Sequence, residues 1–322
     1  MNRILQWVIA VGGLFLVTGW TPSGAIASAW AQAGSEEVPF ITTPDTVTLA
    51  MLTAAQTRPG DHVIDLGSGD GRIVITAAKR FGATGLGVDI VPDLVRQSRR
   101  SAEAAGVGRQ VEFRVEDLFT TDLSRASVIT MYLLPEFNLR LRPALLALEP
   151  GTRIVSHDWD MGDWQPDRTL TLPVPDKAVG REKLSRVHLW WVPSRVQGHW
   201  CAPGGQHLEL RQQHQVLSGW LSLRVAGQPP ERHSVNGRLR GAQLELHGLQ
   251  WQLQGHWQGH QPRSAQGAAP APTDTASHSS ASTERLSLRL QAAGGTTTGG
   301  EPPQAWAASP DGRCPRAATL TP

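Results

Sequence analysis

The sequence predicts an α/β sandwich with a mostly parallel sheet, followed by a small all-β unit. Three observations lead to this prediction. A glycine-rich turn lies between an apolar segment and a helix-like segment, apolar strands then alternate with helices up to about residue 160, and short alternating strands follow residue 194. Strands that alternate with helices favour parallel pairing, because each helix returns the chain across the sheet.

The glycine turn, residues 65–71, follows the apolar segment 62–64 and precedes the helix-like segment 73–80. Its order is D-x-G-x-G-x-G, whereas a dinucleotide loop reads G-x-G-x-x-G and leaves a helix N-terminus open to a pyrophosphate. S-adenosylmethionine has no phosphate, but it has a cationic amino group, a sulfonium and a ribose. A carboxylate beside the turn suits that ligand and repels a pyrophosphate. The residues predicted to bind S-adenosylmethionine here are Asp65, Gly67, Ser68 and Gly69.

Two further acidic residues follow the next two predicted strands. Asp89 ends the strand predicted over 85–90, about twenty residues past the glycine turn, where a carboxylate accepts the ribose hydroxyls. Asp117 follows the strand predicted over 111–115 and is placed to accept the adenine amino group, with Leu118 against the ring. Ile90 is assigned to the same site. Taken singly, Asp89 and Asp117 have an alternative role as caps of the next helix or turn.

The remaining elements complete a seven-stranded sheet. A helix starts near Thr43, the expected N-cap, with Pro44 at its first position. Pro92 opens a helix that runs to residue 105, and a helix over 138–148 is expected to be broken by Pro143. The fourth strand is predicted over 126–134, the fifth over 152–156, and the last two, a closing hairpin, over 168–172 and 187–192.

The chain divides into four predicted regions. Residues 1–31 resemble a secretory signal, with Arg3 before an apolar stretch and a small-residue cleavage site after Ala31. The stretch is also nearly long enough for a membrane anchor, and a soluble helix is the remaining alternative. The other regions are the α/β domain (36–193), a small β-rich domain (194–261) and a low-complexity tail (262–322). The tail is predicted to be disordered apart from a weak apolar alternation at Leu286 to Leu290.

The N-terminal segment predicts a periplasmic or inner-membrane-associated protein, or a cytoplasmic one if the signal does not work. An exported enzyme lacks an obvious supply of S-adenosylmethionine, which is made in the cytoplasm. The net charge of +2 argues against a general nucleic-acid binder. The two cysteines, Cys201 and Cys314, can pair in an oxidising compartment, but a disulfide is not the expected outcome, because Cys314 lies in the predicted tail.

No metal site is predicted. His199, Cys201 and His207 are donors within a short span, but their spacing fits no zinc pattern, so surface or turn positions are the preferred interpretation. Trp159 and Trp164 either cover a substrate slot or seal a loop onto the core, and the second role is the commoner one.

Four motifs carry a resemblance to a known family: residues 39–44, 65–74, 132–135 and 156–164. From Val38 to Asp167 the chain resembles small class I S-adenosylmethionine-dependent methyltransferases. The pattern is similar to that of the mitochondrial lysine methyltransferases that act on the adenine nucleotide translocase and on the c-ring protein of ATP synthase. The resemblance implies a Rossmann-like methyltransferase sandwich with S-adenosylmethionine as cofactor.

The resemblance also implies roles for individual residues. Asp65, Gly67, Gly69, Asp89 and Asp117 would hold the cofactor, Thr43 and Pro44 would shape its lid, and Tyr132 would face the methyl acceptor. A lysine acceptor, with an ordinary pKa of about 10.4, must lose a proton before attack. Asp158 and Asp160 are the candidate carboxylates, and capping of their own loop is the alternative role for both.

The predicted activity is therefore methyl transfer to a nucleophile on a protein, such as a lysine amine, or on a small molecule. Two rival hypotheses stay open. One is a non-catalytic cell-envelope binding module built on a methyltransferase fold, and the other is a small-molecule or RNA methyltransferase. The lack of a basic stripe disfavours RNA, although Arg96, Arg99 and Arg100 weaken that argument. Membrane association through the N-terminus is one of the open alternatives, and the sequence sets no oligomeric state.

Overall fold

The computed structural model describes residues 41–178, 182–223, 229–248, 251–259, 284–292 and 303–314. The predicted signal or anchor, residues 1–31, and much of the predicted tail lie outside the described residues. Within the described ranges, no helix has the length and apolar character needed to cross a membrane.

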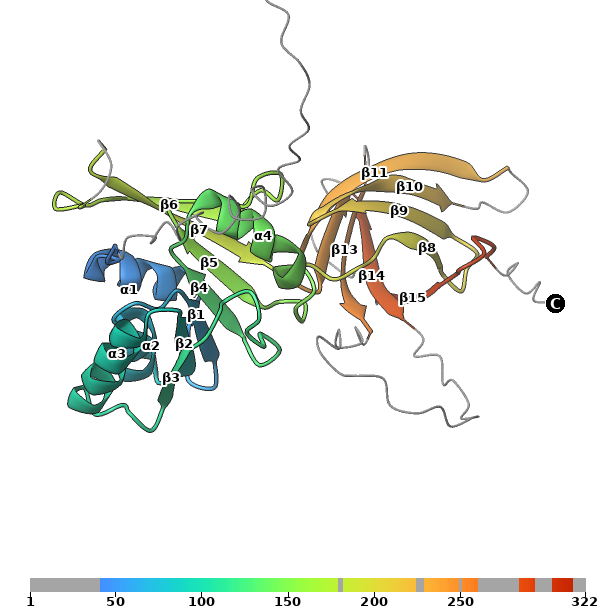
Figure 1. Cartoon of the computed structure of the whole chain (residues 1–322). Coiled ribbons are helices and arrows are strands. Elements are labelled where there is room, and N and C mark those ends of the chain that lie inside the picture. Colours follow the sequence, from blue (N-terminus) through green and yellow to red (C-terminus); the bar gives the residue numbers. More distant parts are fainter. Residues whose placement is uncertain are drawn as a thin grey trace, which may run out of the picture. The chain divides into compact units, whose positions relative to one another are not determined.

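The α/β domain is built on one seven-stranded sheet (Figure 1). Its strand order is β3-β2-β1-β4-β5-β7-β6. The first five strands of this order run parallel, and β7 is antiparallel to both of its neighbours. The sheet is therefore mostly parallel, as the alternation of strands and helices predicted. The strands are β1 (His62–Leu66), β2 (Thr84–Asp89), β3 (Val111–Val115), β4 (Val128–Met131), β5 (Arg153–His157), β6 (Arg168–Pro173) and β7 (Leu184–Trp191).

Helices cover both faces of this sheet. The helices are α1 (Asp45–Ala54), α2 (Arg72–Phe81), α3 (Pro92–Ala104) and α4 (Pro135–Leu145). Neighbouring residues of β1 show the two faces, because successive side chains of a strand point in opposite directions. Val63 packs in a cluster with α1 and α2, whereas Ile64 packs in a cluster with Leu141 and Leu145 of α4.

Helix α4 differs from the prediction. Pro143 lies inside the helix and does not break it, and the helix already starts at Pro135. A proline removes the hydrogen bond to the carbonyl four residues earlier, and its ring crowds that carbonyl. For Pro143 this is the carbonyl of Leu139, within α4, and the helix continues for only two residues beyond the proline.

The second domain is a closed barrel of eight antiparallel strands in the order β10-β11-β12-β13-β14-β15-β8-β9 (Figure 1). Its interior is filled by sixteen buried apolar residues, mostly leucine, including Trp200, Trp257 and Trp306. This filling fits eight strands, which leave an interior just wide enough for side chains. The strands are β8 (Gly198–Cys201), β9 (His207–Gln213), β10 (Val216–Leu223), β11 (Glu231–Arg240), β12 (Gln243–His247), β13 (Trp251–Gln258), β14 (Arg285–Ala292) and β15 (Gln304–Ala308).

The barrel extends beyond the predicted boundary at residue 261. Strands β14 and β15 lie in the predicted tail, so the prediction of disorder is wrong for residues 304–308 and for β14 beyond its weak apolar alternation. Cys314 forms a disulfide with Cys201 of β8, contrary to expectation. Both errors have one cause: β14 completes a ladder with β13, and β15 joins β8, which lies more than a hundred residues earlier in the chain. No local sequence pattern predicts pairing between strands that lie so far apart in the chain.

Candidate active site

The glycine turn forms the predicted connection between β1 and α2. Gly67 and Gly71 adopt φ angles of +76° and +81°, which L side chains rarely adopt. A Cβ on Gly71 would lie 2.6 Å from Ser98 Cβ and 2.7 Å from the Phe113 ring, so only glycine lets the turn pass here. The amides of Gly67 and Ser68 both donate to the carbonyl oxygen of Val88, at 3.0 and 2.9 Å. These bonds fix the turn against the end of β2.

Asp65, the first residue of the turn motif, lies deeper than expected. Its side chain is buried, and Oδ1 accepts a hydrogen bond of 2.7 Å from the Thr130 hydroxyl. Burial raises the pKa of Asp65 to about 7, and the charges of Asp89 and Asp70 add to that rise while Thr130 opposes it. Asp65 therefore lies under the turn, between β1 and β4, and does not project from it.

Asp89 stands at the end of β2, as predicted. Oδ2 accepts the amide of Gly69 at 2.8 Å, and Oδ1 accepts the amide of Val91 at 2.9 Å. A carboxylate offers about four lone-pair sites, so both oxygens retain acceptor capacity. The next residue, Ile90, is 74% exposed, which is unusual for a large apolar side chain. An exposed apolar side chain beside a carboxylate suits a nucleoside, with ribose hydroxyls on Asp89 and the base against Ile90.

The end of β3 contributes the second acidic residue. Asp117 is exposed, and its Oδ1 accepts the amide of Phe119 at 2.9 Å, so it does cap the following turn. Leu118 is partly buried and packs against the core cluster of α4. Val115, the last residue of β3, is 51% exposed and extends the apolar surface at this edge.

The segment before α1 is attached to the glycine turn by Arg72, which the sequence did not single out. Arg72 Nη1 donates to the Thr43 carbonyl at 3.0 Å, and Nη2 pairs with Asp70 at 2.7 Å. Thr43 is buried, and Pro44, not Thr43, occupies the N-cap position of α1. The predicted helix start is therefore displaced by one residue, and Thr43 and Pro44 lie where an arginine joins them to the turn.

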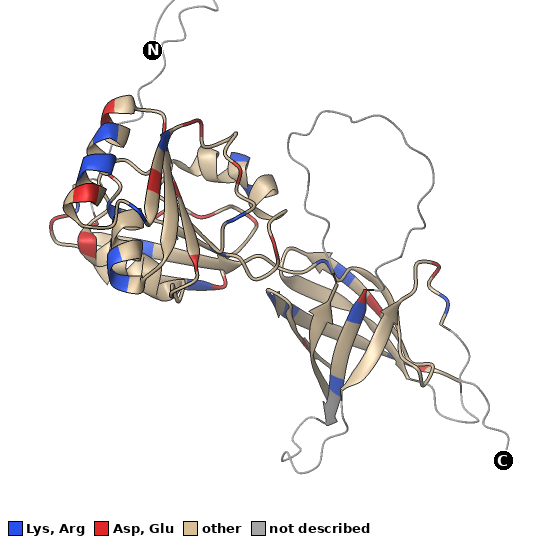
Figure 2. Ribbon diagram, turned by 90° about the horizontal axis from the view of Figure 1, so that it is seen from below, with Lys and Arg blue, Asp and Glu red and all other residues tan. Residues whose placement is uncertain are grey.

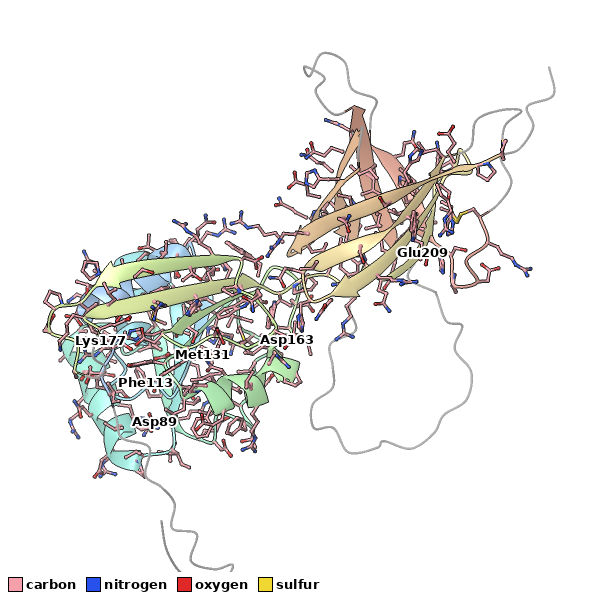
Figure 3. All side chains as sticks on the ribbon, turned by 90° about the horizontal axis from the view of Figure 1, so that it is seen from above. Asp89, Phe113, Met131, Asp163, Lys177 and Glu209 are labelled. Carbon is pink, nitrogen blue, oxygen red and sulfur yellow. A yellow bond between two sulfur atoms is a disulfide. The ribbon has the colours of Figure 1, made fainter. Side chains whose placement is uncertain are left out.

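A second polar cluster lies at the ends of β4 and β5. The Tyr132 and His157 rings are 4.0 Å apart between centroids, and the Tyr132 hydroxyl lies beside the Asp158 carboxylate. Lys177 Nζ pairs with Asp158 Oδ2 at 2.6 Å. His157 Nε2 lies 2.9 Å from Ser185 Oγ. Figure 3 labels Met131, the residue before Tyr132, and Lys177, both in the α/β domain.

The charges in this cluster are set by burial. Burial and the nearby Asp158 charge raise the pKa of Tyr132, so the phenol stays neutral. Burial holds the pKa of His157 well below its ordinary value, with Lys177 adding to that effect and Asp158 opposing it, so the imidazole is neutral at pH 7. Asp158 adopts φ +64° and is held by Arg186, whose amide donates to Oδ1 at 2.9 Å.

Asp160 is not part of this cluster. It is exposed, and its Oδ1 accepts the amide of Gly162 at 3.0 Å, which is the loop-capping role. Trp164 is fully buried and its carbonyl accepts the Trp190 indole N–H, so Trp164 seals the loop onto the core. Trp159 is 44% exposed. Asn138 of α4, which sequence patterns did not indicate, holds the loop by donating to the carbonyls of Trp159 and Asp160.

The barrel residues weighed as metal ligands are engaged otherwise. His199 Nδ1 and His207 Nε2 lie 3.0 Å apart, and Cys201 is bound to Cys314. Within the described residues, no three His, Cys, Asp or Glu side chains are grouped as a metal site.

These features together fit S-adenosylmethionine: a rigid glycine turn, a carboxylate with spare acceptor capacity after β2, and exposed apolar side chains beside it. With the sheet order and the reversed β7, they define a class I S-adenosylmethionine-dependent methyltransferase. The chain belongs to the family of the ANTKMT methyltransferase domain, whose model matches residues 65–168.

Several characterised proteins resemble this chain. A protein-lysine N-methyltransferase of Saccharolobus islandicus is 40% identical over 41% of this chain and 84% of its own length. A lysine N-methyltransferase of Mus musculus, named for the c-ring protein of ATP synthase, is 31% identical over 55% of this chain and 76% of its own length. A solved structure of an RNA methyltransferase from Salinibacter ruber with S-adenosyl-L-homocysteine is 48% identical over 48% of this chain and 96% of that chain, with a TM-score of 0.45.

Proposed function

We propose that this methyltransferase acts on the ε-amine of lysine in a protein. The observation that carries the proposal is the match to two proteins named lysine N-methyltransferases, over 84% and 76% of their lengths. The site agrees with it, because Asp158 offers a carboxylate that attracts an ammonium group beside Tyr132. Acidic and basic residues are interspersed along the ribbon of the α/β domain in Figure 2, which does not favour an RNA acceptor.

In this proposal the cofactor is held by the turn of Gly67, Ser68 and Gly69, by Asp89 through the ribose, and by Ile90, Asp117 and Leu118 around the base. Asp65 supports the turn from below, and Thr43 and Pro44 lie at the lid joined to it by Arg72. When bound, S-adenosylmethionine supplies a methyl group activated by a positive sulfonium. The protein's part is mainly to position the acceptor, which is a large contribution in a displacement at carbon.

Tyr132 and Asp158 are proposed to handle the acceptor amine. Asp158 attracts the ammonium group and is the carboxylate placed to take its proton, whereas Asp160 is committed to its own loop. Tyr132, kept neutral by burial, places its hydroxyl beside Asp158 and so orients that carboxylate. The neutral ring of His157 packs on Tyr132 and supports its position.

The test is transfer of radiolabelled methyl groups from S-adenosylmethionine into protein and RNA fractions of cell lysate. We expect label in protein, and acid hydrolysis should recover it as methyl-lysine. The Asp89→Ala variant supplies the inactive control. Label that appears only in RNA, or in small molecules, would overturn the lysine proposal without affecting the assignment as a methyltransferase.

We also propose that the protein is exported or held at the inner membrane with its domains in an oxidising compartment. The Cys201–Cys314 disulfide supports this location, because disulfides persist in such compartments, and the N-terminal segment has the character of a signal. Cell fractionation with mass determination of the mature N-terminus tests it. Recovery of the intact chain with free thiols from the cytoplasm would contradict the proposal.

A further inference from the structure

Lys177 is an unusual residue in this chain. The sequence has three lysines, Lys79, Lys177 and Lys183, and the other two are exposed. The Lys177 side chain is only 12% exposed, and its ammonium contacts the Asp158 carboxylate and the Leu184 carbonyl, both at 2.6 Å. Elsewhere arginine forms buried or half-buried ion pairs, as in Arg153–Asp61 and Arg72–Asp70. Lys177 is therefore the one lysine of the chain that is largely buried, and its ammonium lies in an ion pair.

The topology places Lys177 at the acceptor side of the sheet. Strand β6 runs in the same direction as β5, because both are antiparallel to β7. The chain that leaves β6 at Pro173 therefore emerges at the edge where β4 and β5 end. That edge carries Tyr132 after β4 and Asp158 after β5.

The surroundings of the Lys177 ammonium are those that a substrate lysine needs. A carboxylate faces the nitrogen, and the Tyr132 hydroxyl lies beside that carboxylate. The neighbouring imidazole of His157, which lies 3.5 Å from Asp158 Oδ2, is neutral and adds no competing positive charge. The backbone amide of Arg186 fixes the other carboxylate oxygen. The site is thus built for one alkylammonium group.

We infer that Asp158 and Tyr132 form the subsite for the acceptor ammonium, and that Lys177 is an internal occupant which the substrate lysine displaces. The inference rests on the proposed lysine specificity. Lys177 competes with the acceptor for the subsite. The apparent affinity for the acceptor is therefore the intrinsic affinity multiplied by the fraction of time that Lys177 leaves the subsite open. Lys177 also keeps the buried carboxylate paired when no acceptor is present, which avoids an isolated buried charge.

The test measures binding of Nα-acetyl-lysine amide to the full chain by calorimetry, with S-adenosylhomocysteine present to exclude turnover. Lys177→Met should bind the probe about tenfold more tightly than the wild type, since the competitor is gone. Lys79→Met is the control, because Lys79 is an exposed lysine in the last turn of α2, and it should bind as the wild type does. Asp158→Asn should weaken binding at least tenfold. Equal affinity of Lys177→Met and the wild type would overturn the inference.

A second measurement needs no variant and guards against misfolding of Lys177→Met. In the wild type, lysines are acylated with an amine-reactive reagent that itself contains no amine. Mass spectrometry measures the labelling of each lysine. Saturating tetramethylammonium, which cannot be acylated, should raise labelling of Lys177 several-fold and leave the exposed Lys79 unchanged. Lys177 labelling that stays constant at saturation would also overturn the inference.

The outcomes separate this inference from the proposed function. If lysine methylation is observed but Lys177→Met leaves probe affinity unchanged, the function stands and the inference fails. If no protein is methylated but Lys177→Met binds the probe more tightly, the subsite is real and the lysine-protein acceptor is wrong.

Discussion

At the scale of single residues, capping a turn and binding the cofactor are compatible roles for the Asp89 carboxylate. Its carboxylate caps the turn that leads into α3, through the amide of Val91, and fixes the glycine turn through the amide of Gly69. These bonds leave acceptor capacity for a ribose, because each carboxylate oxygen accepts more than one hydrogen bond. Capping therefore does not argue against cofactor binding; it orients the carboxylate for that role.

Replacement of Asp89 by alanine should weaken S-adenosylmethionine binding at least about a hundredfold, since two hydrogen bonds to a charged group are lost, each worth about 1.5–3 kcal/mol. Calorimetry measures the effect. Asp93→Ala is the control, because Asp93 is an exposed residue of the following helix α3, and this variant should bind normally. Unchanged affinity in Asp89→Ala would exclude the ribose role.

Asp65 makes a prediction about pH. Its pKa is about 7 in the folded protein and about 3.8 when unfolded, so the folded state binds the proton more tightly. The resulting stabilisation of the fold is fully present below pH 3.8. As the pH rises to 7 this stabilisation is lost, at roughly 1.4 kcal/mol per pH unit.

The Asp65→Asn variant lacks this titration but keeps an acceptor for the Thr130 hydroxyl. Urea unfolding of both proteins from pH 4 to 8 should therefore show the variant gaining stability relative to the wild type as pH rises. The difference should level off above pH 7. Parallel curves over the whole range would contradict a raised pKa of Asp65.

At the scale of elements, one arginine joins the glycine turn to the segment that precedes α1. Arg72 begins α2, pairs with Asp70 of the turn and donates to the Thr43 carbonyl. The position of the segment before α1 thus depends on a residue that also contacts the glycine turn. A change that removes the Arg72 guanidinium should therefore affect both the glycine turn and the segment before α1.

Arg72→Ala should lower cofactor affinity about fivefold to tenfold, which corresponds to the loss of one hydrogen bond of about 1 kcal/mol. Hydrogen exchange at residues 43–48 should accelerate in parallel. Arg72→Lys should not restore either property, because an ammonium cannot reproduce the fork of bonds made by a guanidinium. Arg80→Ala, on the exposed last turn of α2, serves as the control.

The elements of the α/β domain were predictable because their signals are local. The glycine turn, the alternation of strands with helices and the acidic residues after β2 and β3 each lie within a few neighbouring residues. Lys177 was not predictable, since it meets Asp158 only when the β6–β7 hairpin folds onto β5. The burial of Asp65 escaped prediction for a similar reason, because its partner Thr130 belongs to β4.

At the scale of the whole molecule, the sequence indicated an all-β region but not a closed barrel. The barrel closes only when β15 pairs with β8, and the sequence of neither strand indicates which strand it pairs with. The low-complexity composition after residue 261 concealed two strands, from which Leu286, Leu288 and Trp306 enter the barrel core. Pairing over such a distance depends on the assembled barrel.

The disulfide between Cys201 and Cys314 should stabilise the barrel considerably. It closes a loop of more than a hundred residues, for which chain entropy predicts about 4–5 kcal/mol. Urea unfolding followed by tryptophan fluorescence should shift to lower urea when the wild type is reduced. The Cys201→Ser/Cys314→Ser double variant is the control, since reductant should not shift it further. Identical curves for oxidised and reduced wild type would refute this contribution.

The place of that disulfide has a further consequence for self-association. Strands β8 and β15 pair at only two positions, Cys201 with Ala307 and Trp200 with Ala308, the shortest ladder of the barrel. If this ladder opened, both strands would become edges with unpaired backbone groups, which recruit strands of other molecules. The disulfide fastens β8 to the segment just beyond β15 and so keeps these two edges from being presented to a second chain.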